Sequence, residues 1–243
     1  MAFATLLQDG PRTSSAYVEA HDLCLSDLRM KAYQHVDLAL EAGRAHAICA
    51  EDKGGKTELL LTLAGRMRPT SGTCVVGGHD VCTRRGMRAV AKKASLAFFE
   101  NVNDVERVLR VRTIVSAELG LAGKRSDSVS TRAYLADWGL LEVADATIEE
   151  LPQPVYDLLG VALAMAHDPE LLLVSDIERD MTEHQSAKLA ARLCDLAHAR
   201  GVTVVCGVID YDLAARFDSA TCITDDARSQ RQAWERKQCK EVA

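Results

Sequence analysis

The residues best suited to chemistry form one short run, GGKT at positions 54–57. An apolar stretch, residues 45–50, precedes this run, and a leucine-rich helical pattern follows it. At a turn from strand to helix, successive backbone N–H groups can cradle a phosphate while a lysine reaches its outer oxygens. The pattern G-x-x-x-x-G-K-[ST] is missed only at its first glycine, where Ala50 stands. The run predicts a phosphate-binding loop; the alternative is a structural turn whose lysine pairs with Asp52 or Asp176.

Composition limits the classes of partner. The 243 residues are 48% hydrophobic, which is enough for one substantial core with a subdomain. The formal net charge of -6 argues against a nucleic-acid surface, which needs a basic face. No apolar run approaches the ~20 residues that span a bilayer, and residues 1–15 lack the pattern of a signal peptide. We therefore expect a cytoplasmic chain without a membrane segment of its own.

Cysteine and histidine offer no recognisable ligand pattern in the sequence. The eight cysteines form no C-x-x-C pair, and several lie inside apolar runs. The seven histidines share no ligand spacing. We expect the cysteines to be small buried residues in the reduced state, and we expect no metal site built from cysteine and histidine.

Periodicity predicts strands alternating with helices. Short alternating runs over residues 16–40 predict an antiparallel layer, and mostly apolar runs predict buried strands at residues 45–50, 171–174, 202–208 and 220–224. Strands are also predicted in TCVVGGHDV and in SLAFFE, which ends at Glu100. Helices are predicted from Lys56, over residues 155–167, and after a capping box that begins at Thr182.

These elements predict an α/β fold of the P-loop NTPase type, with a mostly parallel core sheet, an antiparallel β layer and a helical subdomain. The expected division of the chain is: 1–15, N-terminal extension; 16–102 and 168–226, α/β core with the phosphate loop; 103–167, helical subdomain; 227–243, charged tail. The residues alone lead to a nucleotide-binding domain.

Four phrases, in order, resemble the nucleotide-binding domain of ABC (ATP-binding cassette) transporters. They are LTLAGRMRPTSG followed by GHDV, YLADWGLLEVADATIEEL, AMAHDPELLLV, and GVTVV followed by DYDLAARFD. The resemblance extends over residues 17–226. It implies that the chain binds ATP and Mg²⁺, pairs with another cassette subunit and docks on a membrane permease at the cytoplasmic face of the membrane.

The resemblance assigns roles to particular residues. The nucleotide would be bound by Gly54, Gly55, Lys56, Thr57 and Glu58. Magnesium would be bound by Thr57 and Asp176, and the candidate catalytic residues are Asp176 and Glu100.

Several catalytic positions depart from the family's pattern. In the family, a strand ending in DE supplies a metal-binding aspartate and a glutamate that polarises water; here Ser175-Asp176 follows the strand, so one carboxylate remains. A shift of one residue would make Asp176 the metal ligand and place Ile177 at the base. Ile209 replaces the switch histidine, and Glu100 replaces the glutamine of the Q-loop.

Charges and prolines alter the remaining contacts. Asp27 stands near the position of an adenine-stacking aromatic residue, and Glu51, Asp52 and Glu58 place acids around the loop. Each of these three acids around the loop would weaken the binding of a solvated triphosphate by on the order of 1 kcal/mol. The signature position, LSGGQ in the family, is LPQPV at residues 151–155, and proline has no N–H to offer a phosphate.

The sequence thus predicts a degenerate, pseudo-ATPase cassette subunit of an ABC transporter, with weak or absent hydrolysis. Two alternatives stay open: a slow but genuine ATPase subunit that works through Lys56, Thr57 and Asp176 with help from Glu100, and a soluble regulatory or scaffold cassette without a permease.

Overall fold

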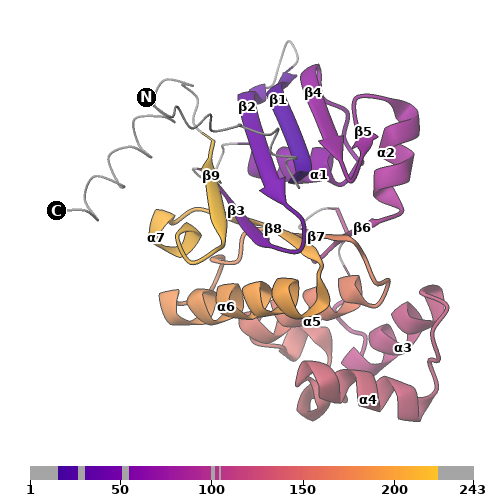
Figure 1. Ribbon diagram of the computed structural model, residues 1–243. Helices are drawn as coiled ribbons and strands as arrows, with labels where there is room; N and C mark the ends of the chain where they lie inside the picture. The colour runs from indigo at the N-terminus through magenta and orange to yellow at the C-terminus, as the bar shows by residue number, and fades with distance from the viewer. Residues whose placement is uncertain (1–15, 27–30, 51–54, 100–101, 104, 224–243) are drawn as a thin grey trace, which may run out of the picture.

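The computed structural model describes residues 16–26, 31–50, 55–99, 102–103 and 105–223. Within this part, an antiparallel sheet, a parallel sheet and a set of helices lie in successive layers (Figure 1). The arrangement confirms the predicted α/β fold with a mostly parallel core sheet and an antiparallel layer. No described helix is long and apolar enough to cross a membrane.

The parallel sheet has the strand order β6-β7-β8-β3-β9. Its strands are β3 (Ala45–Cys49), β6 (Ala94–Leu96), β7 (Leu171–Val174), β8 (Thr203–Val208) and β9 (Ser219–Cys222). Every residue of the three central strands is buried, because helices or a second sheet cover both faces. This burial explains why their sequences are mostly apolar, with His46 of β3 and Thr203 of β8 as the polar exceptions.

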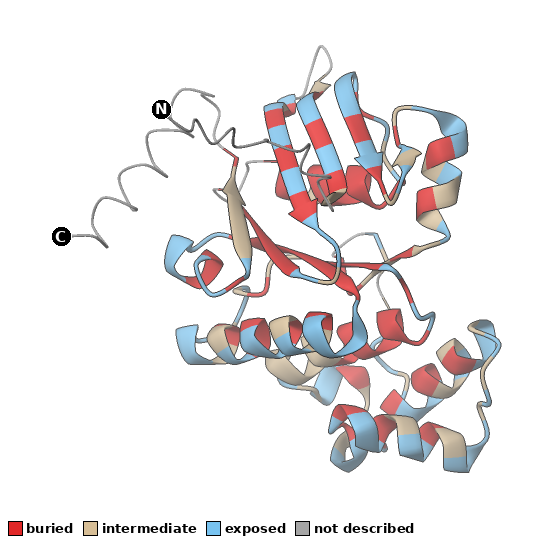
Figure 2. Ribbon diagram, viewed as in Figure 1, coloured by how far each residue is buried: buried red, intermediate tan, exposed pale blue. Residues whose placement is uncertain are grey.

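The antiparallel sheet has the order β2-β1-β4-β5. Its strands are β1 (Ala16–Ser26), β2 (Lys31–Glu41), β4 (Ser71–Val76) and β5 (His79–Asp80). Buried and exposed residues alternate along β2, as expected for a sheet with one face in water (Figure 2).

The helices are α1 (Lys56–Leu63), α2 (Arg84–Ala91), α3 (Val111–Leu121), α4 (Ser128–Trp138), α5 (Gln153–Met165), α6 (Glu183–Arg200) and α7 (Tyr211–Ala214). Two short 3-10 turns, Leu141–Val143 and Ile148–Glu150, lead into α5. Helix α1 shares one hydrophobic core with the antiparallel sheet, while α3 to α6 share the other (Figure 1). Helix α2 was not predicted from the sequence.

The parallel sheet divides the interior into two cores. Leu171 and Leu173 of β7 point to the core shared with α1, whereas Leu172 and Val174 point to the core shared with α5 and α6. This alternation is the two-residue period of a strand. The sheet therefore fixes α1 on one face and the helical layer on the other.

Some predicted boundaries were wrong. Helix α5 begins at Gln153 rather than at residue 155, because Pro152 (φ -60°) caps it and proline fits the first turn of a helix. Strand β6 ends at Leu96 instead of continuing toward Glu100, since the N–H of Phe99 donates to Asn103 Oδ1 (2.7 Å). The capping box at Thr182 is confirmed, with Gln185 returning a bond to the N-cap backbone.

One buried histidine makes the stability of the fold depend on pH. His46 Nε2 donates to the carbonyl of Glu41 (2.9 Å), and Nδ1 lies 2.6 Å from the hydroxyl of Ser219. Burial lowers the pKa of His46 below the 6.5 of a solvated histidine. The unfolded chain therefore binds this proton first as the pH falls.

We predict that the free energy of unfolding declines as the pH falls below about 6.5, and that His46→Gln removes part of this decline. Urea unfolding between about pH 8 and about pH 5 measures both slopes. Equal pH dependence in the two proteins, or a His46 imidazole that titrates above 6.5 by NMR, would contradict the assignment.

Candidate nucleotide site

The candidate site lies where the carboxyl ends of three adjacent strands meet. Strand β8 pairs with β7 on one side and with β3 on the other, all parallel. The chain leaves β3 for the loop before α1, leaves β7 for Asp176, and leaves β8 for Ile209. Ligands of open α/β sheets bind at this edge. The topology therefore brings together residues far apart in the sequence.

Gly55 shapes the turn into α1. It is the N-cap residue, with a left-handed backbone (φ 71°), and a Cβ on it would lie 1.8 Å from the carbonyl oxygen of Ala32 in β2. Only glycine fits both the conformation and the close approach. The predicted glycine turn is thus held against the antiparallel sheet.

Lys56 is bound within the protein. Its side chain is only 5% exposed, and its Nζ lies 2.9 Å from Asp176 Oδ1. It also donates to the carbonyl of Val208 (3.2 Å). The contact with Asp176 is a charge–charge contact rather than an aligned hydrogen bond, since Asp176 Oδ1 lacks an aligned donor within the described structure. The pairing with Asp176 that the sequence left open as an alternative is present.

A second carboxylate, from Glu178, binds the turn after β8. Its oxygens accept the backbone N–H groups of Ile209 and Asp210, the latter at 2.7 Å. Backbone N–H groups at a strand-to-helix turn are the donors that an anionic ligand would use. In this chain, an internal carboxylate already uses them. Sequence reasoning missed Glu178, because no local pattern indicates that it reaches a turn thirty residues away.

The other sequence-predicted residues have different outcomes. Thr57 and Glu58 lie half-buried in the first turn of α1, next to Lys56. Gly54 and Glu100 lie outside the described residues, as do Asp27, Glu51 and Asp52. The structure thus brings Gly55, Lys56 and Asp176 to one edge of the sheet.

The signature position forms the start of α5. Pro152 and Pro154 have no N–H, and the N–H of Val155 donates to the Pro152 carbonyl (2.9 Å). A helix N-terminus that has lost these donors holds an anion poorly.

Asp157, one turn into α5, is a further group that the sequence did not indicate. Burial raises its pKa to about 6, although Gln153 donates to its Oδ1 (2.8 Å). Its other oxygen, Oδ2, has no hydrogen-bond partner in the described part of the chain. Burial thus makes its carboxylate form unfavourable.

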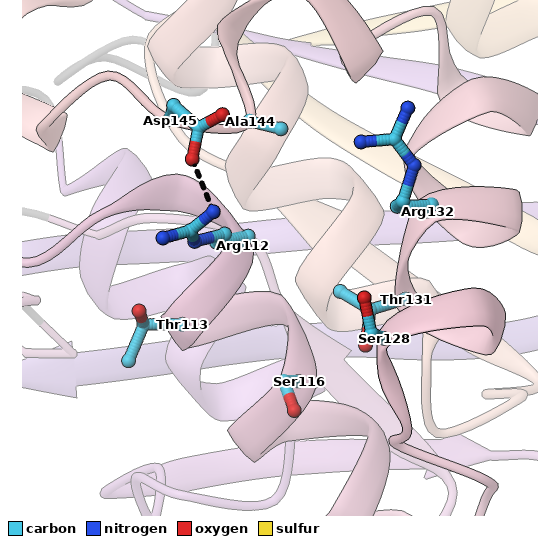
Figure 3. A pocket seen from close by; sticks show the side chains of 8 residues that line it. All are labelled: Arg112, Thr113, Ser116, Ser128, Thr131, Arg132, Ala144 and Asp145. Atoms are coloured by element: carbon cyan, nitrogen blue, oxygen red, sulfur yellow. Dashed lines mark ion pairs between the residues drawn. The ribbon is translucent and has the colours of Figure 1, made fainter.

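A cavity of about 390 Å³ lies apart from this edge, between α3 and α4 (Figure 3). Hydroxyl groups and two arginines line it, and Arg112 is ion-paired with Asp145. This pairing neutralises much of the charge that an anion would need. The cavity has no part in the nucleotide site.

The residues present fit a triphosphate and its metal only in part. Gly55 and α1 supply the turn and the helix start, and Lys56 and Asp176 supply one cation and one carboxylate. A nucleotide would have to displace Asp176 from Lys56 and work without the turn donors that Glu178 uses. The geometry is therefore that of a phosphate-type site in which the chain's own carboxylates already contact most of the groups that a phosphate would use.

Comparison with known proteins identifies sequences similar to this chain, although no family model matches it. It is 25% identical over 196 residues to a phosphonates import ATP-binding protein of Thiobacillus denitrificans, with 77% of this chain and 75% of that protein covered. It is 28% identical over 191 residues to a methionine import ATP-binding protein of Cereibacter sphaeroides, covering 76% of this chain and 52% of the relative.

Solved structures share the architecture at lower identity. The protein cbiO1 of Clostridium perfringens, part of the ABC transporter complex cbiONQ, superposes with a TM-score of 0.74 at 16% identity, covering 86% of this chain and 85% of that one. A dimeric post-hydrolysis state of the cassette MJ0796, bound to ADP and Pi, gives 0.71 at 16% identity, covering 86% and 94%. At such identities the likeness shows the fold. The chain thus has the fold of an ATP-binding cassette, and the sequences it is similar to are ATP-binding subunits of ABC transporters.

Proposed function

We propose that this chain is a degenerate cassette subunit of an ABC transporter, which binds ATP and Mg²⁺ weakly and hydrolyses ATP slowly or not at all. In the same proposal it pairs with another cassette subunit and docks on a membrane permease. The relatives reported above are named as import proteins, so we place the chain on an importer.

The observation that carries the proposal is the occupation of the site by internal carboxylates. Asp176 lies 2.9 Å from Lys56 Nζ, and Glu178 accepts two N–H groups from the turn after β8. Both contacts must weaken before a triphosphate can enter, and both carboxylates repel it. Each such charge costs on the order of 1 kcal/mol in a solvated site and more in a buried one.

The chemistry of hydrolysis is also depleted. Asp176 is a single carboxylate where a metal ligand and a base are both required, and Ile209 offers only its backbone to a γ-phosphate. Oriented bases and charge-stabilising donors contribute ~10²–10⁴ each to rates. Losing two of them leaves a rate several orders of magnitude below that of a complete site.

Partner contacts can be assigned to two surfaces. The start of α5, with Pro152 and Pro154, would face the other cassette subunit and contribute little to the binding of that subunit's nucleotide.

A groove of about 390 Å³ runs between β6 and α5, and its lining includes Phe98, Val102 and Gly160. A Cβ on Gly160 would lie 2.8 Å from the ring of Phe98, so this glycine permits the close packing at the groove floor. We assign the groove to the permease.

A nucleotide-binding experiment tests the proposal that internal carboxylates weaken the binding of ATP and Mg²⁺. We predict that Glu178→Gln binds ATP with Mg²⁺ about fivefold more tightly than the unmodified chain, which corresponds to removing about 1 kcal/mol of repulsion. Lys56→Ala should bind no ATP. Thermal-shift titration measures all three, with Glu183→Gln on α6 as a matched control that leaves affinity unchanged. Weaker binding by Glu178→Gln would contradict the proposal.

The slow-ATPase alternative is favoured by one observation, the retention of Lys56, Thr57 and Asp176 at one edge. It predicts that Asp176→Asn weakens Mg²⁺-dependent ATP binding by removing a metal ligand. Our proposal predicts that the same variant releases Lys56 and strengthens binding. The direction of the change separates the two.

A co-purification experiment tests the proposal that the chain docks on a membrane permease. Val102 is 45% exposed and lines the groove, so Val102→Asp should reduce co-purification with the permease at least several-fold without lowering the melting temperature. Val129→Asp, at a 78% exposed position in α4, is the control. The measurement is quantitative recovery of membrane proteins with the tagged full chain. Recovery without any membrane protein would favour the soluble scaffold.

A further inference from the structure

Three side chains with metal-ligand chemistry meet on the antiparallel sheet. They are Asp22 and Cys24 of β1 and His35 of β2, and their ligand atoms all lie within 4.8 Å of one another. They form the one group of three such ligands in the described part of the chain. We call this group the β1–β2 triad.

The three members already contact one another. His35 Nδ1 lies 2.6 Å from Asp22 Oδ1, and the backbone N–H of His35 donates to Cys24 Sγ (3.2 Å). The Cys24 thiol donates in turn to the Asp22 carbonyl (3.5 Å), so metal binding would exchange this bond for one from the deprotonated sulfur to the ion. The three residues are thus already grouped by direct contacts.

The backbone at two members is unusual. Asp22 (φ 49°) and His35 (φ 53°) are non-glycine residues in the left-handed region, on opposite strands. Register shifts flank this part of the β1–β2 pairing, as at a β-bulge, which turns a side chain away from its regular direction. Such conformations are unfavourable for residues other than glycine and persist where the surroundings fix them.

The surroundings do fix Asp22. Its N–H donates to Asp37 Oδ1 (2.9 Å), and Gly72 of β4 approaches so closely that a Cβ there would lie 2.3 Å from the Asp22 carbonyl oxygen. Cys24 is 8% exposed, whereas the side chains of Asp22 and His35 are 71% and 60% exposed. The triad therefore has one buried ligand, two accessible ones and an open path from solvent.

We propose that the β1–β2 triad binds a borderline-soft divalent metal ion of the Zn²⁺ class. Thiolate, imidazole and carboxylate are together the donors that Zn²⁺ takes, with bonds of about 2.0–2.3 Å. Binding at these lengths places tetrahedral ligand atoms about 3.4 Å apart, so the Asp22–His35 contact opens by less than about 1 Å. The Cys24 thiol gives its proton to solvent, neutral His35 binds through Nδ1, and a fourth position remains for water.

The sequence hid this group. Cys24 and His35 are eleven residues apart on different strands, which matches no local ligand spacing. The competing explanation is an exposed ion pair, Asp22–His35, beside a thiol that merely fills space. The two explanations differ in whether the thiol is needed for metal binding.

The test is a Zn²⁺ titration of the purified, reduced full chain against a chromogenic chelator. We expect one Zn²⁺ per chain, with affinity lowered about 10- to 100-fold or more in Cys24→Ser and in His35→Asn. Asparagine tolerates the left-handed backbone, so His35→Asn removes the ligand without adding strain. Cys194→Ser and His184→Asn, on α6, should bind as the unmodified chain does.

A Co²⁺ spectrum gives an independent readout. The unmodified chain should show a thiolate-to-metal charge-transfer band that Cys24→Ser abolishes and Cys194→Ser keeps. If Cys24→Ser does not fold, His35→Asn and Asp22→Asn decide the outcome, because both replace exposed side chains. Zn²⁺ affinity unchanged in these variants, or no charge-transfer band in the unmodified chain, would overturn the proposal.

Discussion

The contact on which the rest of this site depends is the one between Lys56 and Asp176. It joins the first residue of α1 to the end of β7, and the bond from Lys56 to the Val208 carbonyl adds the end of β8. An ammonium group 5% exposed would be costly without such partners. The pair therefore stabilises the buried Lys56 ammonium in the folded protein. The same contact neutralises the positive charge that would otherwise bind a phosphate.

Glu178 extends the same constraint to the neighbouring turn. Glu178 accepts hydrogen bonds from the N–H groups of Ile209 and Asp210, so these donors are already bonded and are not free to bind an anion. The two carboxylates together order the edge of the sheet without a nucleotide. In the function proposed above, a fold that its own charges hold together would keep its role as a packing partner although its chemistry is depleted.

The fold was largely predictable, because it depends on local patterns and on burial. Mostly apolar runs indicated β3, β7 and β8, and the capping box indicated the start of α6. Helix α2 was missed because its sequence is mostly polar and basic, with only Gly86 and Val90 buried. The predicted start of α5 was two residues late, because Pro154 lies in the first turn of the helix, where proline is tolerated.

The site was predictable only where a short motif carries it. Gly55, Lys56 and Asp176 follow from the loop pattern and from the strand that ends at Val174. Glu178, Asp157 and the β1–β2 triad depend on contacts between distant segments or on burial, and no spacing in the sequence encodes them. Their roles follow from the strand order and from the bulge between β1 and β2.

The rate of ATP hydrolysis tests the central claim most directly. We predict that the purified chain with ATP and Mg²⁺ hydrolyses several orders of magnitude more slowly than the ~1 s⁻¹ at the low end of ordinary enzymes, close to the background measured with Lys56→Ala. A rate near or above ~1 s⁻¹ that Lys56→Ala abolishes would contradict the account.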